Sequence, residues 1–481
     1  MTMNQLFVGR EKEQQQLREY LDSPQSEFIT VYGRRRVGKT FLIQKVVGMD
    51  YAFYAAGMNS VSMRLQLANF MQGIRKKRPD VPAADTWLDA FVALESYLES
   101  LPVGKKIVFI DEMPWMDTPR SNFISGLEHF WNSWASWRDD IKLIVCGSAT
   151  SWIINNLIKN RGGLHNRVTH KILVKPFTLR ECKMYFEARG FRLSSKQIAE
   201  CYMVLGGVPF YLSKMDNGES IPQNIDRLIF APDGELHDEF QSLYNSLYKN
   251  ADNHIKIVTA LATKCKGLTR QELVKLTRIA DNGKFSTKLE ELESCGFIRS
   301  YEPFGNRRGG FGTVQSPDTL FQLVDPFTLF YFQVMRKTDS KDPNYWTNNQ
   351  KSHVFSTWSG FSFEMLCLNH AEQIKMALGI SGITANVCSW FGKGERRSAQ
   401  IDMLIDRADN AVNICEMKFY NNPYALTARD EDDIERKIST FLESTGTDKT
   451  VILTMVTVKG IEKNEHSGCV QKEVVLDALF C

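Results

Sequence analysis

The sequence predicts a multidomain α/β protein, and three observations support this fold class. The chain has 481 residues, more than one hydrophobic core normally serves, so we expect three or four domains. Two apolar runs, at residues 28–32 and 107–110, are typical of buried strands, and each leads into residues with a chemical signature. Near residue 400, two further predicted strands carry carboxylates and a lysine.

The first strand is followed by the pattern G-x-x-x-x-G-K-T and then by a helix-like segment over residues 40–47. The glycines allow a tight turn and a close approach to phosphate, and the N–H groups of the loop and the helix N-terminus face the anion. Lys39 supplies a mobile charge for the β- and γ-phosphates, and Thr40 a hydroxyl for Mg²⁺. We therefore predict ATP and Mg²⁺ as cofactors. The predicted ATP-binding loop consists of Gly33, Arg34, Arg35, Arg36, Val37, Gly38, Lys39 and Thr40.

The second strand runs into two adjacent acids, Asp111 and Glu112, about 70 residues after the loop. Alone, an apolar run ending in two acids is usually only a strand end. After a phosphate loop it indicates the partner acidic motif, because the carboxyl ends of parallel strands are where ligands bind. We expect Asp111 to belong to the Mg²⁺ shell and Glu112 to polarise the attacking water.

A third buried strand, over residues 141–147, ends in a polar tip where Ser148 or Thr150 is placed to sense the γ-phosphate. Farther on, a glycine-rich loop at residues 160–167 carries two arginines. Arg167 is the candidate for stabilising transition-state charge, in its own subunit or in a neighbouring one. The alternative is a solvated arginine with no role in the reaction.

Residues 253–323 predict three short helices and a two-stranded wing, which together make a winged helix. Lys284, Lys288, Arg307 and Arg308 are candidates for contacts with DNA phosphates. Such modules also serve as spacers, and three glutamates on the third helix would repel a major groove. DNA contact and a spacer role therefore both stay open.

The C-terminal part holds the second chemical constellation. Residues 400–406 and 411–418 predict two strands joined by a turn at 407–410. Asp402 and Glu416 lie symmetrically about Asp409, so a simple hairpin sets them opposite each other, and Lys418 shares a face with Glu416. In this arrangement the two acids would bind Mg²⁺, and Lys418 would orient or deprotonate the attacking water. A surface hairpin with salt bridges is the alternative.

Composition narrows the choice of partners and compartment. The net charge is only +3, so any nucleic-acid surface must be local. We expect no signal peptide and no membrane association, because the start has no apolar segment and no stretch of 18 apolar residues occurs. The ten cysteines are scattered singly, without zinc-binding spacing, which favours buried thiols in a reducing cytoplasm.

The whole chain resembles a family of prokaryotic archaeal-type ATPases of the AAA+/STAND class that carry a C-terminal domain related to PD-(D/E)XK restriction endonucleases. The resemblance rests on residues 7–11, 33–40, 107–112, 206–209, 358–364 and 400–418. It implies a P-loop ATPase core over 1–178, a helical lid over 179–245, a winged helix over 246–330 and a nuclease-like α/β domain over 331–481. One departure is the run of three arginines in the loop.

The resemblance also implies roles for three further places in the chain. The segment Phe7–Glu11 looks like the one that packs on the adenine, and the Gly-Gly-x-Pro turn ending in Pro209 like the lid turn that faces the nucleotide. Glu364, on an amphipathic helix expected over 358–374, matches the extra acid that the first helix of nuclease-like domains contributes.

Three functions remain open from the sequence. The first is an ATPase that controls a nuclease acting on DNA. The second is an ATP-driven switch that binds DNA or a protein partner through its winged helix and a catalytically silent nuclease fold. The third is a signalling ATPase with no nucleic acid. Self-association of the chain also stays open.

Overall fold

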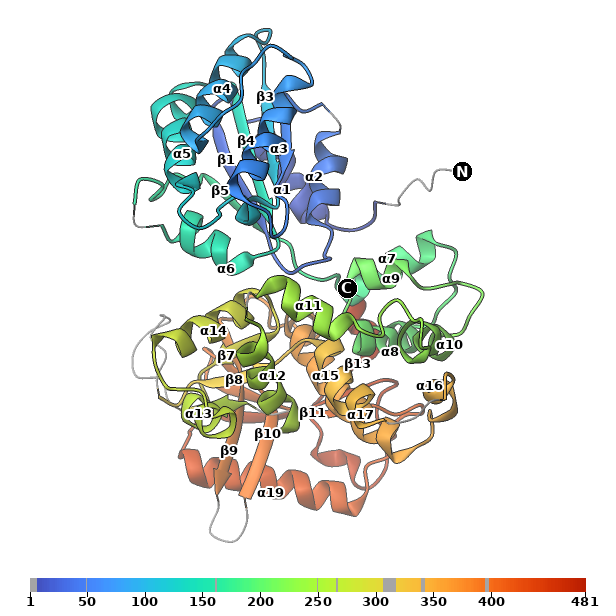
Figure 1. The fold of residues 1–481 in the computed structure, drawn as a ribbon. Helices are drawn as coiled ribbons and strands as arrows, with labels where there is room; N and C mark the ends of the chain where they lie inside the picture. Colours follow the sequence, from blue (N-terminus) through green and yellow to red (C-terminus); the bar gives the residue numbers. More distant parts are fainter. Residues whose placement is uncertain are drawn as a thin grey trace. The chain divides into compact units, whose positions relative to one another are not determined.

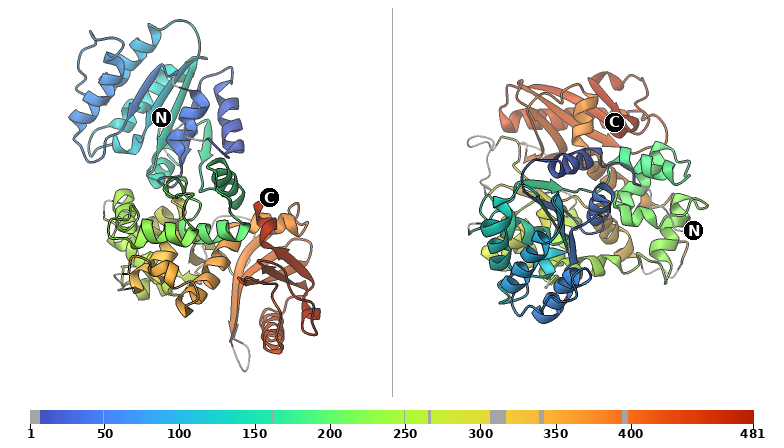
Figure 2. Two further views of the ribbon diagram at one scale, coloured as in Figure 1. Left: turned by 90° about the vertical axis from the view of Figure 1, so that its right-hand side faces the viewer. Right: turned by 90° about the horizontal axis from the view of Figure 1, so that it is seen from above.

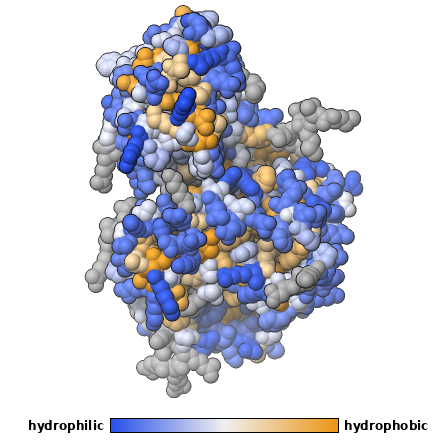
Figure 3. All heavy atoms as spheres, viewed as in Figure 1, coloured by the Kyte–Doolittle hydropathy of each residue, from blue (hydrophilic) through white to orange (hydrophobic). Residues whose placement is uncertain are grey.

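The computed structural model describes residues 7–48, 50–160, 162–248, 250–264, 267–305, 317–338, 342–393 and 398–481. The chain divides into two compact units, Met1–Pro176 and Phe177–Cys481. Figure 1 shows a sheet flanked by helices in the first unit, and helices together with a second sheet in the other. Polar side chains cover most of the visible surface of each unit, with smaller hydrophobic areas between them (Figure 3). Among the described residues, no helix has the length and apolar character needed to cross a bilayer.

The first unit is built on a parallel five-stranded sheet with the order β2-β3-β4-β1-β5. Its strands are β1 Glu27–Tyr32, β2 Phe53–Ala56, β3 Lys106–Asp111, β4 Ile141–Gly147 and β5 His170–Leu173. Its helices are α1 Glu11–Leu21, α2 Lys39–Val47, α3 Met63–Arg75, α4 Trp87–Glu99, α5 Phe123–His129 and α6 Thr150–Ile153. Helices cover both faces, as the views in Figure 2 show: α1 and α2 share one core with the sheet, and α3, α4 and α5 share the other.

This strand order positions the candidate site. Because β4 pairs in parallel with both β1 and β3, the segments that follow these three strands emerge at the same edge of the sheet. In the three central strands β1, β3 and β4, consecutive residues point to opposite apolar cores, so the middle of each strand is largely apolar. The polar residues that follow the strands are therefore collected at one edge.

The second unit begins with helices in the region that the sequence assigns to a lid: α7 Leu179–Ala188, α8 Ser195–Leu205, α9 Pro209–Ser213, α10 Ile221–Ile225 and α11 Glu239–Leu247. A small antiparallel sheet of order β6-β8-β7 accompanies the next three helices. These elements are α12 Asp252–Lys264, β6 Leu268–Thr269, α13 Arg270–Thr277, α14 Gly283–Ser294, β7 Ile298–Tyr301 and β8 Leu320–Leu323. Arg307 and Arg308 lie outside the described residues. The winged-helix assignment stays a proposal.

A mixed five-stranded sheet of order β13-β12-β11-β10-β9 forms the C-terminal part of this unit. Its strands are β9 Ala385–Lys393, β10 Ser398–Arg407, β11 Ala411–Lys418, β12 Thr450–Thr457 and β13 Lys472–Val475. The helices here are α15 Pro326–Gln333, α16 Tyr345–Asn348, α17 His353–Asn369, α18 Ala371–Ala377 and α19 Ala428–Thr445. The single helix expected over 358–374 is wrong: α17 ends at Asn369 and α18 begins after His370.

His370 lies at this break and connects the predicted lid to the C-terminal part through a hydrogen bond. Its Nε2 accepts the N–H of Leu179, at the start of α7, at 3.1 Å, so Nδ1 carries the proton and donates to the Leu366 carbonyl at 2.9 Å. One hydrophobic core extends from Phe177 to Leu479. The boundaries proposed at 245 and 330 therefore lie inside a single compact unit.

We expect the stability of this unit to fall on acidification through His370. Burial lowers the pKa of His370 from 6.5 to about 4, although its hydrogen bond to the Leu366 carbonyl opposes this shift. The stabilisation is complete above pH 6.5 and is lost as the pH falls toward 4, by up to about 3 kcal/mol. Urea unfolding of the native chain and of His370→Gln at several pH values measures this. The variant should be less stable at pH 7.5, with a difference that shrinks toward pH 4, and a constant difference would contradict the prediction.

Candidate functional site

The phosphate loop has the backbone that the glycine positions predict. Gly33 has φ of 141°, and a Cβ there would lie 2.2 Å from the carbonyl oxygen of Val174, so only glycine fits. Gly38, with φ of 87°, is the residue that precedes α2. Arg36 also adopts a left-handed conformation, with φ of 71°, although arginine rarely does so. The loop thus turns sharply and leads directly into the N-terminus of α2.

Lys39 turns back over this loop. The side chain is buried, and its Nζ donates hydrogen bonds to the carbonyls of Gly33 and Arg34, each at 2.9 Å. Both acceptors are neutral carbonyls, which an ammonium can leave for a stronger acceptor. A phosphate oxygen is such an acceptor, since hydrogen bonds between ionised groups are stronger than those to a carbonyl.

Thr40 and Asp111 meet, as the sequence predicts for a magnesium site. The Thr40 hydroxyl donates to Oδ2 of Asp111 at 2.9 Å, and Oδ1 of Asp111 accepts the N–H of Glu112 at 2.9 Å. Burial raises the pKa of Asp111 above its usual value, although the bond from Thr40 opposes this shift. A hydroxyl and a carboxylate are oxygen donors of the kind that Mg²⁺ prefers, so these residues fit the ion in their chemistry.

Glu112 lies beside Ser148, a contact that the spacing of the motifs does not reveal. Glu112 has a left-handed backbone, with φ of 43°, at the end of β3. Its Oε2 accepts the N–H of Ser148 at 3.1 Å and the hydroxyl at 3.0 Å. The expected water-polarising acid and the expected γ-phosphate sensor thus form one hydrogen-bonded pair. Thr150 is buried, and its hydroxyl donates to the Ser148 carbonyl at 3.5 Å.

The N-terminal segment packs directly on the phosphate loop and its helix. Nη2 of Arg10 donates to the Val37 carbonyl at 3.1 Å, and the rings of Phe7 and Phe41 lie edge to face with 5.6 Å between centroids. The left-handed backbone of Gly9, with φ of 71°, and of Arg10 precedes α1. The segment is therefore close enough to the loop to take part in nucleotide binding.

Two predicted nucleotide contacts stay predictions. Arg167 lies in an exposed turn whose backbone N–H bonds to the Leu164 carbonyl at 3.1 Å. Pro209 is the first residue of α9 and belongs to the second compact unit.

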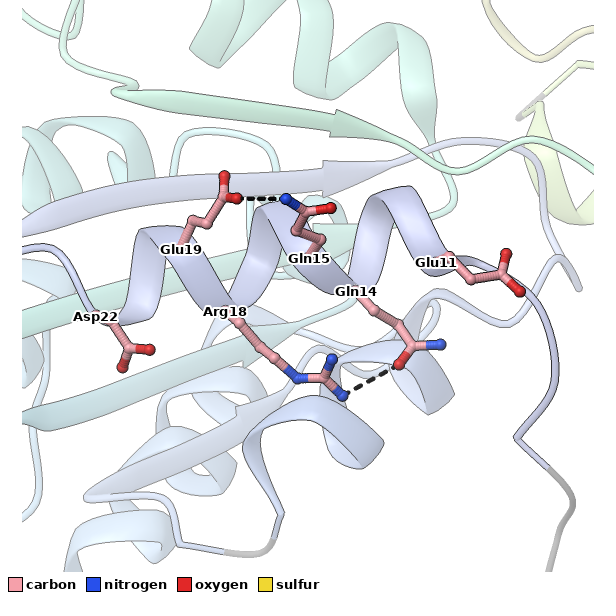
Figure 4. Close-up of a pocket in the computed structure, with 6 residues that line it drawn as sticks. All are labelled: Glu11, Gln14, Gln15, Arg18, Glu19 and Asp22. Carbon is pink, nitrogen blue, oxygen red and sulfur yellow. Dashed lines mark hydrogen bonds between the residues drawn. The ribbon is translucent and has the colours of Figure 1, made fainter.

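A pocket in the first unit lies elsewhere, along the exposed side of α1 (Figure 4). Its lining residues bond mainly with one another: Gln15 donates to Glu19 at 2.8 Å, and Arg18 to Gln14 at 3.1 Å. This groove holds no phosphate-binding element, and we assign no function to it.

In the second unit, the hairpin of β10 and β11 has the predicted register. Met403 pairs with Cys415 and Asp406 with Val412, so the strands are symmetric about Asp409. Continued by one residue, this register sets Asp402 opposite Glu416. Gln400 donates a hydrogen bond to Oδ1 of Asp402.

Glu364 on α17 completes the acidic group. Burial raises its pKa well above the usual range, and the nearby charges of Asp402 and Glu416 raise it further, against the attraction of Lys437 and Lys418. The four residues predicted from the sequence therefore interact electrostatically.

Lys437 on α19 is a member of this group that the sequence reasoning missed. It forms an ion pair with Glu416. The ammonium of Lys418 lies instead over the ring of Tyr424, 5.6 Å from its centroid. The sequence did contain a signal for this position. Lys437 lies three residues after Ile434 and four before Phe441, and both of these residues are buried. The lysine therefore lies on the buried stripe of α19, although most of this helix is charged.

The carboxylates fit a divalent ion by their donor chemistry, but they are not gathered around one point. Within the described ranges, no three His, Cys, Asp or Glu side chains are close enough to hold a metal together. Glu416 forms an ion pair with Lys437, so a metal ion would have to compete with this ammonium for the carboxylate. Magnesium binding by Asp402 and Glu416 stays a prediction.

Two of the three glutamates of α14 have partners within the unit, and the third, Glu290, is exposed. Glu291 accepts from His254 at 2.7 Å, and Glu293 accepts the N–H of Ser300 at 2.7 Å and also its hydroxyl, so both are engaged within the unit. Lys284 is exposed and Lys288 is half-buried.

The parallel sheet, the phosphate loop and the Thr40–Asp111 pair define the first unit as a P-loop nucleotide-binding domain of the ATPase type. Residues 7–215 match the model of a family described as an ATPase domain predominantly from Archaea. This stretch is thus an archaeal-type ATPase domain, and that part of the sequence prediction is confirmed.

Comparison with individual proteins extends beyond this domain. The chain is similar to an uncharacterized protein of Methanocaldococcus jannaschii, MJECL04, with 24% identity over 475 residues, which cover 96% of this chain and 98% of that protein. Among solved structures, it is similar to the Walker-type ATPase PABY2304 of Pyrococcus abyssi, with 18% identity, a TM-score of 0.47, and coverage of 68% of this chain and 96% of that one. For the ORC2 protein of Aeropyrum pernix the identity is 16%, the TM-score 0.32, and the coverage 70% and 98%. The similarity to the M. jannaschii protein extends over both compact units.

Proposed function

We propose that this protein binds and hydrolyses ATP with Mg²⁺, and that its ATPase controls a C-terminal PD-(D/E)XK nuclease-like site that acts on DNA. The observation that carries the ATPase part is the meeting of Thr40 with Asp111 next to the buried Lys39. Lys39 would bind phosphate, the pair would hold Mg²⁺, and Glu112 would polarise the attacking water.

The nuclease part is supported by the register of the β10–β11 hairpin and by the electrostatic coupling of Glu364, Asp402 and Glu416. A bound Mg²⁺ would supply a Lewis acid and a more acidic water. Asp402 and Glu416 would hold it, with Glu364 as a further acid, and Lys418 would orient the water. The DNA would meet local basic residues, since the net charge of the chain is only +3.

A second candidate function is an ATP-driven switch that binds DNA or a protein partner, or associates with itself, through a catalytically silent nuclease fold. The ion pair between Glu416 and Lys437 favours this candidate, because it occupies a carboxylate that catalysis would need.

Cleavage of linear and single-stranded DNA, with Mg²⁺ or Mn²⁺ and with or without ATP, tests these proposals. For a nuclease, we expect Lys418→Ala to lower the cleavage rate by about 100-fold or more, because the attacking water loses its orienting ammonium. Lys472→Ala, at an exposed lysine on β13 of the same sheet, should cleave like the native chain.

The outcomes separate the candidates. Metal-dependent cleavage that ATP alters, and that Lys418→Ala loses, supports the controlled nuclease. Cleavage unaffected by Lys418→Ala would remove this lysine from the mechanism. Salt-sensitive DNA binding without cleavage would support the switch, and indifference to DNA would support a signalling ATPase.

A further inference from the structure

Lys437 is a charged side chain enclosed with the carboxylates of the candidate nuclease site. Its side chain is 20% exposed and that of its ion-pair partner, Glu416, is 12% exposed. Burial by itself lowers the pKa of Lys437, but the charges of Glu416 and Asp402 outweigh this and raise the pKa above its ordinary value. The ion pair thus places the positive charge of Lys437 directly against the carboxylate of Glu416.

The fold explains why this lysine reaches Glu416. Side chains alternate along β11, so Glu416 lies on the same sheet face as Val412 and Ile414. These two residues share a core with Ile434 and Phe441 of α19. Since Lys437 lies on the same helix stripe, packing of α19 against this face brings the ammonium to the carboxylate.

Lys418, the lysine expected to serve this site, has other surroundings. Its ammonium lies over the ring of Tyr424, whose hydroxyl donates to Asp430 at 3.0 Å. Within the described part of the chain, no salt bridge joins Lys418 to a carboxylate. The two lysines are therefore not equivalent. Lys437 donates a hydrogen bond to Oε1 of Glu416, whereas the ammonium of Lys418 contacts an aromatic ring.

We propose that Lys437 is an internal counter-ion of this site, which holds Glu416 until a divalent cation takes that carboxylate. This inference rests on the proposed metal-dependent site. Glu364, Asp402 and Glu416 repel one another when ionised, so without a metal a positive charge beside Glu416 stabilises its ionised form. A divalent ion supplies two charges and competes with the ammonium for the same oxygen. Metal binding and release of Lys437 are then a single exchange, and Lys437 acts as a positioning residue for Glu416.

Isothermal titration calorimetry of the nucleotide-free chain with Mn²⁺ tests the exchange without any measurement of cleavage. In Lys437→Met, Mn²⁺ no longer competes with an ammonium, and we expect its affinity to rise by about 10-fold or more, equivalent to about 1.4 kcal/mol. Lys437→Arg keeps the charge and should bind Mn²⁺ like the native chain. Lys472→Met, at an exposed lysine on β13 of the same sheet, is the matched control and should leave the affinity within about 3-fold.

Glu416→Gln in each background provides the blank, since any Mn²⁺ bound near Thr40 and Asp111 remains in that variant. Thermal unfolding of each variant shows whether it is folded. If Lys437→Met is not folded, Lys437→Gln takes its place, because glutamine also lacks the charge but can still donate a hydrogen bond to Glu416. A higher Mn²⁺ affinity in folded Lys437→Gln than in the native chain supports the exchange, and an equal or lower affinity overturns it.

Equal or weaker binding of Mn²⁺ by a folded Lys437→Met would overturn the counter-ion role while leaving the metal site intact. Failure of both the native chain and Lys437→Met to bind Mn²⁺ beyond the blank would overturn the proposed metal-dependent nuclease together with this inference.

Discussion

Lys39→Ala is expected to abolish useful ATP binding while leaving the first unit folded. The variant loses the ammonium that now bonds to the carbonyls of Gly33 and Arg34. With ATP, this ammonium would instead contact the β- and γ-phosphates. Two charge-assisted hydrogen bonds of about 1.5–3 kcal/mol each predict a loss of about 3 kcal/mol or more, which is at least about 100-fold in affinity.

Binding of a fluorescent ATP analogue in the presence of Mg²⁺ measures this effect, with circular dichroism and thermal unfolding to confirm the fold. Lys45→Ala is the matched control, because Lys45 is exposed in the last turn of the same helix, near Phe41. It should bind ATP like the native chain. Undiminished affinity in Lys39→Ala would remove the loop from nucleotide binding.

Glu112→Gln is expected to bind ATP normally and to lower its turnover by about 100-fold or more, within the range for loss of a general base. The amide oxygen of glutamine can accept the same two hydrogen bonds from Ser148, so the local structure should persist. What changes is the negative charge, which the variant lacks for polarising the attacking water.

Single-turnover hydrolysis at saturating ATP separates binding from chemistry here. Glu19→Gln, which removes an exposed acid on α1, should hydrolyse ATP at the native rate. Near-normal turnover by Glu112→Gln would exclude Glu112 from the water-polarising role, and the acid would then have to lie elsewhere in the site.

The pairing of Glu112 with Ser148 also connects two roles that the sequence keeps apart. A γ-phosphate that accepts a hydrogen bond from the Ser148 hydroxyl would remove this hydroxyl from the Glu112 carboxylate. The same change in Ser148 would then both detect the nucleotide and release Glu112 to act on the water. Ser148→Ala retains the backbone N–H contact to Glu112 but loses the hydroxyl contact.

The sequence by itself determined the phosphate loop, the strand ends that carry Asp111 and Glu112, and the symmetry of the hairpin about Asp409. These features depend on short-range rules. Glycines at fixed spacing decide where a loop can turn, apolar runs decide which strands are buried, and the alternation of side chains decides which residues share a face.

Only the tertiary structure decided which long-range neighbours meet. The order of strands, with β4 between β1 and β3, brings Ser148 to Glu112. Docking of α19 brings Lys437 to Glu416. One hydrophobic core extends from Phe177 to Leu479 and joins the predicted lid to the C-terminal sheet, and the hydrogen bond between Leu179 and His370 connects the same two parts. The physical reason is that burial of a helix stripe depends on apolar surfaces far away in the sequence, which no local pattern contains.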